Sequence, residues 1–345
     1  MTKKLLIIRF SAMGDVAMLV PVVHDLASQY PDTSITLLTR ERLTPFFDWM
    51  PSNVETLGVN LKDYEGLRGL GRLYARLKPL QFDAVADMHD VLRSKYLRTR
   101  FRFAGIPVAV IDKGRREKKE LIGQGQTHAP LPAMTNRYAQ VLSQLGMPVS
   151  LSYKQAFDPS AENLSPVTDL FGRKPEGEHW VGVAPFAAHE NKVYPLSKMH
   201  EVVKTLSGRG MRVFLFGAGK HESEVLAEWE EGNQVVSICG KMKGLHDEML
   251  LMSQLDLMLA MDSSNMHIAS IVGTPTVSVW GATHPKAGFT PWGQPQSHII
   301  EDSSLPCRPC SIYGKEPCRF HDLRCMNRIT PETIVEKVDE VLQGH

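Results

Sequence analysis

The sequence predicts an α/β protein made of two doubly wound, Rossmann-like domains that face each other across a cleft. Short apolar or β-branched runs alternate with helical patterns almost from end to end, which is typical of βαβ units and parallel sheets. A length of 345 residues corresponds to about two domains of roughly 150 residues each. Domains of this kind bind ligands at the carboxyl ends of their strands, so we expect the chemistry between the two halves.

Ten strands are expected, five in each half. They are continuously apolar rather than alternating, as strands buried on both faces are. The runs are Leu5–Arg9, Ile35–Thr39, Val54–Val59, Ala84–Asp87 and Val108–Ile111, then Trp180–Pro185, Met211–Gly217, Val235–Ile238, Leu257–Met261 and Pro275–Trp280.

The two sets of strands are separated by a stretch rich in Pro, Gly and Glu, residues 159–178, which is interpreted as a linker. We therefore expect domains at 1–165 and 175–330. Residues 331–345 are predicted to form a final helix that packs back toward the N-terminal domain. Thr330 is its expected N-cap, with Pro331 at the first helical position.

Composition excludes several classes of protein. The chain is 43% hydrophobic and 22% charged, which is usual for a globular protein and unlike a disordered or collagen-like one. Its 39 Lys and Arg against 38 Asp and Glu leave a net charge of +1, so no nucleic-acid partner is expected. The first apolar run stops at Arg9, too short for a signal peptide, and no run reaches the length of a membrane span. We expect a cytoplasmic protein.

The first predicted strand is followed by Arg9-Phe10-Ser11-Ala12-Met13-Gly14-Asp15 and an apolar helix starting near Val16. Asp15 is either the N-cap of that helix or a carboxylate facing the crevice. As a carboxylate facing the crevice, it would accept a proton from an incoming hydroxyl.

A second polar segment follows the predicted strand at 257–261. Asp262, Ser263, Ser264 and Asn265 lead into a helix that contains His267. Free backbone amides at the positive end of a helix suit a diphosphate, so we expect an anion site here. Capping alone is the alternative.

Two weaker signals lie in the same half. Gly217-Ala218-Gly219 follows a strand as in a phosphate-binding turn, but Glu222 replaces the third glycine of the dinucleotide fingerprint. Glu222 would accept hydrogen bonds from a ribose, or it is an ordinary first-turn residue. Lys192 precedes a helix, and in a cleft it would pair with phosphate oxygens.

The segment 93–119 holds ten Lys or Arg and two acids, a local charge of +8 that leaves −7 for the rest of the chain. We expect a positive field over the first domain that attracts a polyanionic acceptor or an anionic membrane surface; a solvated helix face is the alternative. Arg93, Lys95 and Arg98 are the candidate contacts, together with Arg9.

Four of the five cysteines, Cys307, Cys310, Cys318 and Cys325, are spaced C-x2-C-x7-C-x6-C. Only the first pair has the spacing of a zinc knuckle. They are either reduced packing residues or ligands of a structural zinc, and no metal is expected in catalysis.

Taken together, these motifs resemble glycosyltransferase family 9, the ADP-heptose:lipopolysaccharide heptosyltransferases. The resemblance covers most of the chain. It depends on Arg9–Asp15, on Asp87–Ser94, on Lys192 with Pro195, and on Asp262–His267 continuing through Gly273-Thr274-Pro275 to Trp280-Gly281-Ala282-Thr283-His284-Pro285. His89-Asp90 stands where many relatives have Gln-Gly, and Phe186-Ala187-Ala188 lacks hydroxyls that some relatives place on the phosphates.

The resemblance implies a GT-B fold, with an acceptor-binding N-terminal domain and a C-terminal domain for a nucleotide sugar. It implies that Asp15 is the general base, Lys192 a phosphate partner, Glu222 a ribose-binding acid and Asp262 a contact of the sugar. Ser263, Ser264, Asn265, His267 and Gly217 would complete the donor site.

The expected function is therefore inverting transfer of a heptose or related sugar from an ADP-sugar to a lipopolysaccharide core or lipid A-type acceptor, without a cofactor. The enzyme would act in the cytoplasm, or peripherally at the inner membrane. A nucleotide-sugar epimerase or hydrolase of the same fold and a non-catalytic nucleotide-sugar-binding protein are the alternatives.

Overall fold

The computed structural model describes residues 3–125 and 128–344, and the chain divides into two compact units. Unit 1 comprises Met1–Lys113 and Ala133–Ala156, and unit 2 comprises Gly114–Pro132 and Phe157–His345. Each unit is built on one parallel sheet, as the alternating pattern predicts. Among the described residues, no helix is long and apolar enough to cross a membrane.

Unit 1 has a five-stranded sheet in the order β3-β2-β1-β4-β5. The strands are β1 (Lys3–Ile8), β2 (Thr33–Arg40), β3 (Val54–Val59), β4 (Ala84–Asp87) and β5 (Val108–Val110). Its helices are α1 (Met13–Ala17), α2 (Val20–Gln29), α3 (Gly66–Leu77), α4 (Leu92–Phe103) and α6 (Met134–Gln144), with short 3-10 turns η1 (Glu41–Phe47) and η2 (Lys78–Leu80).

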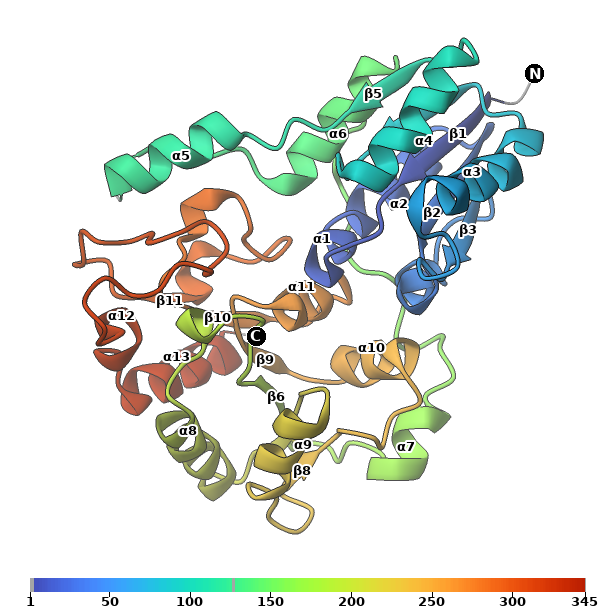
Figure 1. Cartoon of the computed structure of the whole chain (residues 1–345). Helices are drawn as coiled ribbons and strands as arrows, with labels where there is room; N and C mark the ends of the chain where they lie inside the picture. Colours follow the sequence, from blue (N-terminus) through green and yellow to red (C-terminus); the bar gives the residue numbers. More distant parts are fainter. Residues whose placement is uncertain (1–2, 126–127, 345) are drawn as a thin grey trace. The chain divides into compact units, whose positions relative to one another are not determined.

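Helices cover both faces of this sheet, which is why β1 is apolar without alternation. Leu6 and Ile8 pack with Leu73 of α3 and Leu97 of α4 in one core, while α2 and α6 pack on each other. Figure 1 shows this unit in blue to green, with α3 and α4 lying together over the strands.

Unit 2 has a six-stranded sheet in the order β11-β10-β9-β6-β7-β8. The strands are β6 (Trp180–Ala184), β7 (Arg212–Leu215), β8 (Val235–Ser237), β9 (Leu257–Met261), β10 (Thr276–Trp280) and β11 (Ile299–Glu301). Its helices are α5 (Arg115–Gln124), α7 (Ser165–Phe171), α8 (Leu196–Gly208), α9 (Lys220–Ala227), α10 (Leu245–Ser253), α11 (Ser264–Ile271), α12 (Arg324–Asn327) and α13 (Pro331–Gln343), with 3-10 turns η4 (Glu190–Lys192), η5 (Pro285–Ala287) and η6 (Gln296–His298).

All ten predicted strands are present within two residues of their expected ends, but β11 was not expected. It has only three residues and pairs with β10 at the edge of the sheet. The predicted linker also contains α7, which buries Val167 and Phe171. A three-residue strand and a two-turn helix carry too little periodicity to be recognised in sequence.

The domain boundary expected near residue 165 is wrong for one segment, because Gly114–Pro132 leaves unit 1 and joins unit 2. Leu121 of α5 packs with Leu131, Ala287 and Ile312 in a small core. Lys118 is buried beside it, with its ammonium 4.5 Å from the ring centroid of Phe289. The +8 stretch is therefore split between the two units.

The final helix begins as predicted, since the Thr330 side chain accepts a hydrogen bond from the Thr333 N–H and Pro331 is the first helical residue. The helix belongs to unit 2, and its packing toward the N-terminal domain stays a prediction. Ile334 and Val338 are buried in the core of unit 2, and α13 packs on α8. The apolar stripe of a helix shows that it has a partner but does not say which one.

Candidate active site

The candidate residues of unit 1 lie where the strand order reverses. β1 is flanked by β2 on one side and β4 on the other, so the segments after β1 and β4 leave the sheet in neighbouring positions. Ligands of doubly wound sheets bind at such a point. Arg9–Asp15 follows β1, and Asp87–Arg93 follows β4.

Asp15 belongs to the first turn of α1, at its third residue, because the helix begins at Met13 and not near Val16. Its Oδ2 accepts the N–H of Ala12 at 3.2 Å and lies 2.6 Å from Arg9 Nη2. The Tyr138 hydroxyl donates to the Asp15 carbonyl at 3.1 Å. The carboxylate is thus capping the helix and fixed by a cation, yet 25% of its side chain stays exposed for a substrate.

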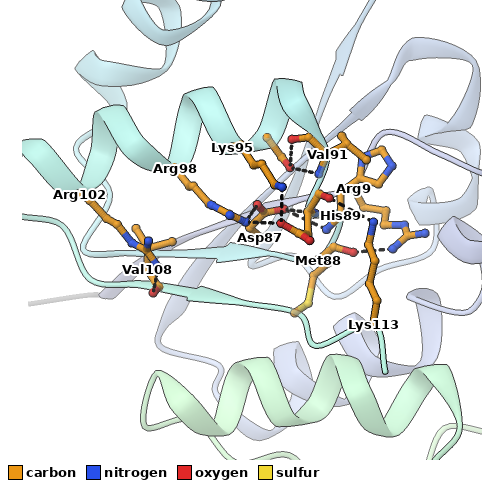
Figure 2. A network of polar contacts seen from close by, with 12 residues as sticks. Arg9, Asp87, Met88, His89, Val91, Lys95, Arg98, Arg102, Val108 and Lys113 are labelled. Atoms are coloured by element: carbon orange, nitrogen blue, oxygen red, sulfur yellow. Dashed lines mark hydrogen bonds and ion pairs between the residues drawn. The ribbon is translucent and has the colours of Figure 1, made fainter. Parts of the chain in front are cut away.

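Arg9 does not have the free guanidinium expected of an acceptor contact. It is 4% exposed, and Nη1 donates to the Met88 carbonyl at 2.5 Å while Nη2 pairs with Asp15. Figure 2 shows Arg9 directed at the segment after β4. Its role in the structure is to join the ends of β1 and β4 around Asp15.

His89 lies beside the same carboxylate and is neutral. Burial, and then the charges of Arg9 and Lys113, lower the pKa of His89 to about 3. Its Nδ1 accepts the Phe10 N–H at 3.3 Å, so the ring proton is on Nε2, which lies 3.3 Å from Ser11 Oγ. The ring is therefore a fixed hydrogen-bond donor next to Ser11.

Two of the predicted acceptor contacts are held in ion pairs (Figure 2). Arg98 Nη1 lies 2.8 Å from Asp87 Oδ2 and 2.9 Å from Asp90 Oδ1, and Lys95 Nζ lies 3.7 Å from Asp90 Oδ1. Asp87 is fully buried and also accepts the N–H groups of His89 and Asp90. This network sets the course of residues 87–91, so Arg98 in particular positions the loop.

The candidate residues of unit 2 also lie at a reversal of strand order, between β6 and β9. Lys192 follows β6, and its Nζ lies 2.9 Å from Asp262 Oδ2 at the end of β9. Thr283 Oγ1 donates to the same Oδ2 at 2.7 Å. The side chains of Lys192 and Asp262 are 14% and 9% exposed, so a cation and an anion predicted separately form one nearly buried pair.

Helix α11 begins directly after this pair. Ser263 is its N-cap residue, with extended backbone, but its side chain makes no capping hydrogen bond. Ser263 Oγ is buried and has no hydrogen-bond partner among the described residues. Ser264 and Asn265 form the first turn, half-buried, and His267 is buried one turn further. Backbone amides, a hydroxyl and the Lys192 ammonium thus gather at the positive end of a helix.

Gly217 and Glu222 follow β7, the other neighbour of β6. The Glu222 Oε2 accepts the Ala218 N–H at 2.8 Å, so this carboxylate holds the turn before α9. A Cβ on Gly217 would lie 2.8 Å from Leu226 Cδ1, which explains the glycine by close packing. Glu222 keeps a second oxygen for a ribose.

Sequence reasoning missed the residues that hold Lys192 in place. Asn191 Nδ2 donates to the Glu316 carbonyl at 2.5 Å, which ties η4 to the segment 314–316. Gly314 has φ +76°, and a Cβ there would lie 2.6 Å from Lys192 Cγ. A cavity of about 500 Å³ is lined by this segment and by residues 188–191. Nothing in the sequence around Asn191 or Gly314 indicates that these two residues support Lys192.

The four clustered cysteines are free thiols. In the described part of the chain, no group of three or more His, Cys, Asp or Glu is placed so that it would hold a metal ion. Burial raises the pKa of the Cys325 thiol to about 11. The thiol form and the tight packing of Cys325 agree with the packing interpretation, and nothing supports the zinc site.

Comparisons with known proteins identify the family of this chain. The family model of glycosyltransferase family 9 (heptosyltransferase) matches residues 70–319. The chain belongs to this family. It is therefore a glycosyltransferase, as the motifs indicated.

Named relatives in the family span the whole chain. Lipopolysaccharide heptosyltransferase 1 of Pseudomonas aeruginosa is 22% identical, with 98% of both chains covered. Lipopolysaccharide heptosyltransferase 2 of Escherichia coli K12 is 26% identical, also with 98% of both covered.

Solved structures confirm the GT-B fold class. The E. coli ADP-heptose lps heptosyltransferase II has a TM-score of 0.71 at 20% identity and covers 99% of each chain. A glycosyl transferase family 9 protein of Veillonella parvula has a TM-score of 0.75 at 17% identity, covering 100% of this chain and 98% of its own.

Proposed function

We propose that this glycosyltransferase moves a heptose or a related sugar from an ADP-sugar to a lipopolysaccharide core or lipid A-type acceptor, with inversion at the anomeric carbon. The names of the relatives support this substrate class. E. coli heptosyltransferase WaaC, of similar fold, was solved with ADP, which supports the donor.

The observation that carries the proposal is the Lys192–Asp262 pair beside the start of α11. A departing diphosphate needs its charge met by groups already in place, and an ammonium with free helix amides meets it. Asp262 holds the Lys192 ammonium in position before the donor arrives. Glu222 would accept hydrogen bonds from the ribose of the same nucleotide.

The acceptor hydroxyl would be activated in unit 1. The Asp15 carboxylate takes its proton, the hydroxyl oxygen forms a bond to the anomeric carbon, and the bond from that carbon to the diphosphate breaks. The electron pair leaves with the ADP. Arg9 and Ala12 orient the carboxylate for this step, and one displacement on one face inverts the anomeric centre.

Asp15→Asn tests this assignment, because it keeps the size of the side chain and removes the base. We expect transfer to fall by at least 10²-fold, within the range of general base catalysis, while ADP binding stays within about twofold. Asp158→Asn, on an exposed loop, is the matched control. Normal turnover of Asp15→Asn together with weak ADP binding would reverse the roles assigned to the two units.

Product analysis separates transfer from the alternatives. A labelled ADP-heptose should give labelled acceptor, whereas an epimerase or hydrolase would release an epimer or free sugar with no acceptor present. A UDP-N-acetylglucosamine 2-epimerase of Listeria monocytogenes has a related fold, with a TM-score of 0.52 at 12% identity. That likeness concerns fold alone. Donor binding without any labelled product would identify a non-catalytic binding protein.

A further inference from the structure

Positive charge at the carboxyl edge of the unit 1 sheet exceeds what the nearby acids neutralise. Asp15 forms an ion pair with Arg9, and Asp87 and Asp90 both form ion pairs with Arg98. Lys95 forms a longer ion pair with Asp90. Lys113 donates to the Asp90 carbonyl at 3.2 Å. These pairs use the carboxylates that follow β1 and β4.

Three more arginines, Arg40, Arg42 and Arg93, lie in the same region without such partners. Within residues 3–125 and 128–344, their side chains make no ion pair or hydrogen bond. Arg40 Nε is buried and unsatisfied. A buried donor without a partner costs free energy, so the Arg40 Nε favours a hydrogen-bond acceptor from outside the chain at this edge of the sheet.

These arginines are brought together by the topology of the sheet. Arg40 is the last residue of β2, beside β1, and Arg42 is the second residue of η1, which follows immediately. Arg93 is the second residue of α4, which follows β4 on the other side of β1. All three thus come from segments that leave the same edge of the sheet.

The electrostatics agree that they are close. Burial, and then the charges of Arg42 and Arg93, lower the pKa of Arg40. Arg40 also contributes to lowering the pKa of His89, whose ring lies beside Ser11 and near Asp15. The cluster therefore borders the group proposed to activate the acceptor.

We propose that Arg40, Arg42 and Arg93 form a binding site for a phosphate group. Planar guanidiniums at one edge of a sheet offer several N–H donors to the oxygens of one phosphate, and repulsion among three cations is relieved most by a doubly charged anion. Resting on the proposed function, we assign this phosphate to the acceptor, where it places the reactive hydroxyl beside Asp15.

The binding test is independent of transfer. Phenylglyoxal modifies accessible arginines, and peptide mass spectrometry reads each one separately in the full-length protein. Inorganic phosphate at millimolar concentration should slow modification of Arg40 and Arg93 several-fold, relative to sodium chloride of equal ionic strength. Arg102, exposed further along α4, is the internal control and should react equally in both salts. Equal rates at Arg40 and Arg93 in the two salts would overturn the proposal.

The source of the phosphate is tested with Arg40→Gln and Arg93→Gln, with Arg102→Gln as the matched control. The wild type should prefer a phosphorylated acceptor over its dephosphorylated form, and each variant should raise KM for the phosphorylated acceptor about tenfold or more, leaving the KM for ADP-heptose unchanged. Phosphate protection without acceptor preference would show a site for free phosphate and overturn the acceptor assignment. If the protein proved to have no transferase activity, phosphate protection of Arg40 and Arg93 would still demonstrate the phosphate site.

Discussion

Asp15 and Asp262 are each held by one cation, and in both pairs the partners come from segments that the fold brings to a reversal of strand order. A carboxylate at such a point is fixed in orientation before substrate binds. That fixation is what positioned catalytic groups require, because reorientation during the reaction would raise the barrier. The two pairs nevertheless differ, because in the first the cation Arg9 positions the proposed base Asp15. In the second the carboxylate Asp262 positions the cation Lys192.

Lys192→Gln should weaken ADP binding and lower kcat by about 10² to 10³-fold, the usual cost of removing one preorganised donor from developing charge. Lys220→Gln, exposed on α9, is the control and should leave both quantities unchanged. Steady-state kinetics and ADP titration measure the effect. A variant that binds ADP as the wild type does would place the diphosphate elsewhere.

His89 should make the fold less stable in acid. Its pKa is about 3 in the folded chain and near 6.5 when unfolded, so between these values the unfolded state binds a proton that the folded state does not. Stability from this group is present above about pH 6.5 and is lost progressively as pH falls toward 3. At pH 4.5, two units below the pKa of the unfolded state, the loss should be about 2.7 kcal/mol.

Urea unfolding of wild type and His89→Asn at pH 7.5 and 4.5 measures this contribution. Asn preserves an acceptor for the Phe10 N–H and removes the titration. The stability difference between the two pH values should be smaller for the variant. Equal differences would mean that His89 does not control acid stability.

The sequence showed which charged residues lie near the site more reliably than it showed what each of them contacts. Asp15, Lys192 and Asp262 follow strands of the two sheets, whereas Arg9 and Arg98, which were predicted as acceptor contacts, form ion pairs with Asp15, Asp87 and Asp90. Residue type and spacing show which charges are present. They do not show which opposite charge folds against them, even when that partner is as near in the chain as Asp87 and Asp90 are to Arg98.

At the scale of elements, Gly114–Pro132 is the clearest departure from expectation. It is followed in the chain by unit 1 residues but packs in unit 2. Lys118 is nearly fully buried, and its ammonium lies 4.5 Å from the ring centroid of Phe289 and 5.6 Å from that of Tyr313. A basic residue that sequence patterning assigned to a solvated or anion-binding face is thus an anchor of α5.

Lys118→Met should loosen α5, because it keeps the apolar stem and removes the cation that contacts two aromatic rings. A buried cation–π contact contributes roughly 1 to 2 kcal/mol. Hydrogen exchange should therefore become about tenfold faster in α5 and stay unchanged in α4. Lys119→Met, exposed on the same helix, is the control. Unchanged exchange in Lys118→Met would show that Leu121 and Leu131 suffice to hold the helix.

At the scale of the whole molecule, the proposed function assigns the acceptor to unit 1 and the donor to unit 2. Both units have the same plan, a parallel sheet with its candidate residues at the reversal of strand order, yet their charges differ. Unit 1 has Arg40, Arg42 and Arg93 at the edge of its sheet, whereas unit 2 has the nearly buried Lys192 and the start of α11. This difference favours an anionic acceptor in the first and a nucleotide diphosphate in the second.

A panel of nucleotide sugars should distinguish donors by thermal stabilisation of the full chain. The true donor at 100 times its dissociation constant should add about 2.7 kcal/mol to the stability of the state that binds it. We expect ADP-sugars to stabilise more than UDP- or GDP-sugars. Lys192→Gln should lose most of this stabilisation, and a larger effect from a UDP-sugar would correct the proposed base.

The sequence by itself determined the α/β class, the ten main strands and the residue types that follow them, because local periodicity and chain punctuation encode elements directly. Tertiary structure decided which unit α5 and α13 join, that Arg9 and Arg98 are internal partners, and that Gly314 and Asn191 support Lys192. Those outcomes depend on contacts between residues more than a hundred positions apart in several cases. Such contacts are selected by packing and charge balance in the folded chain, and no local pattern records them.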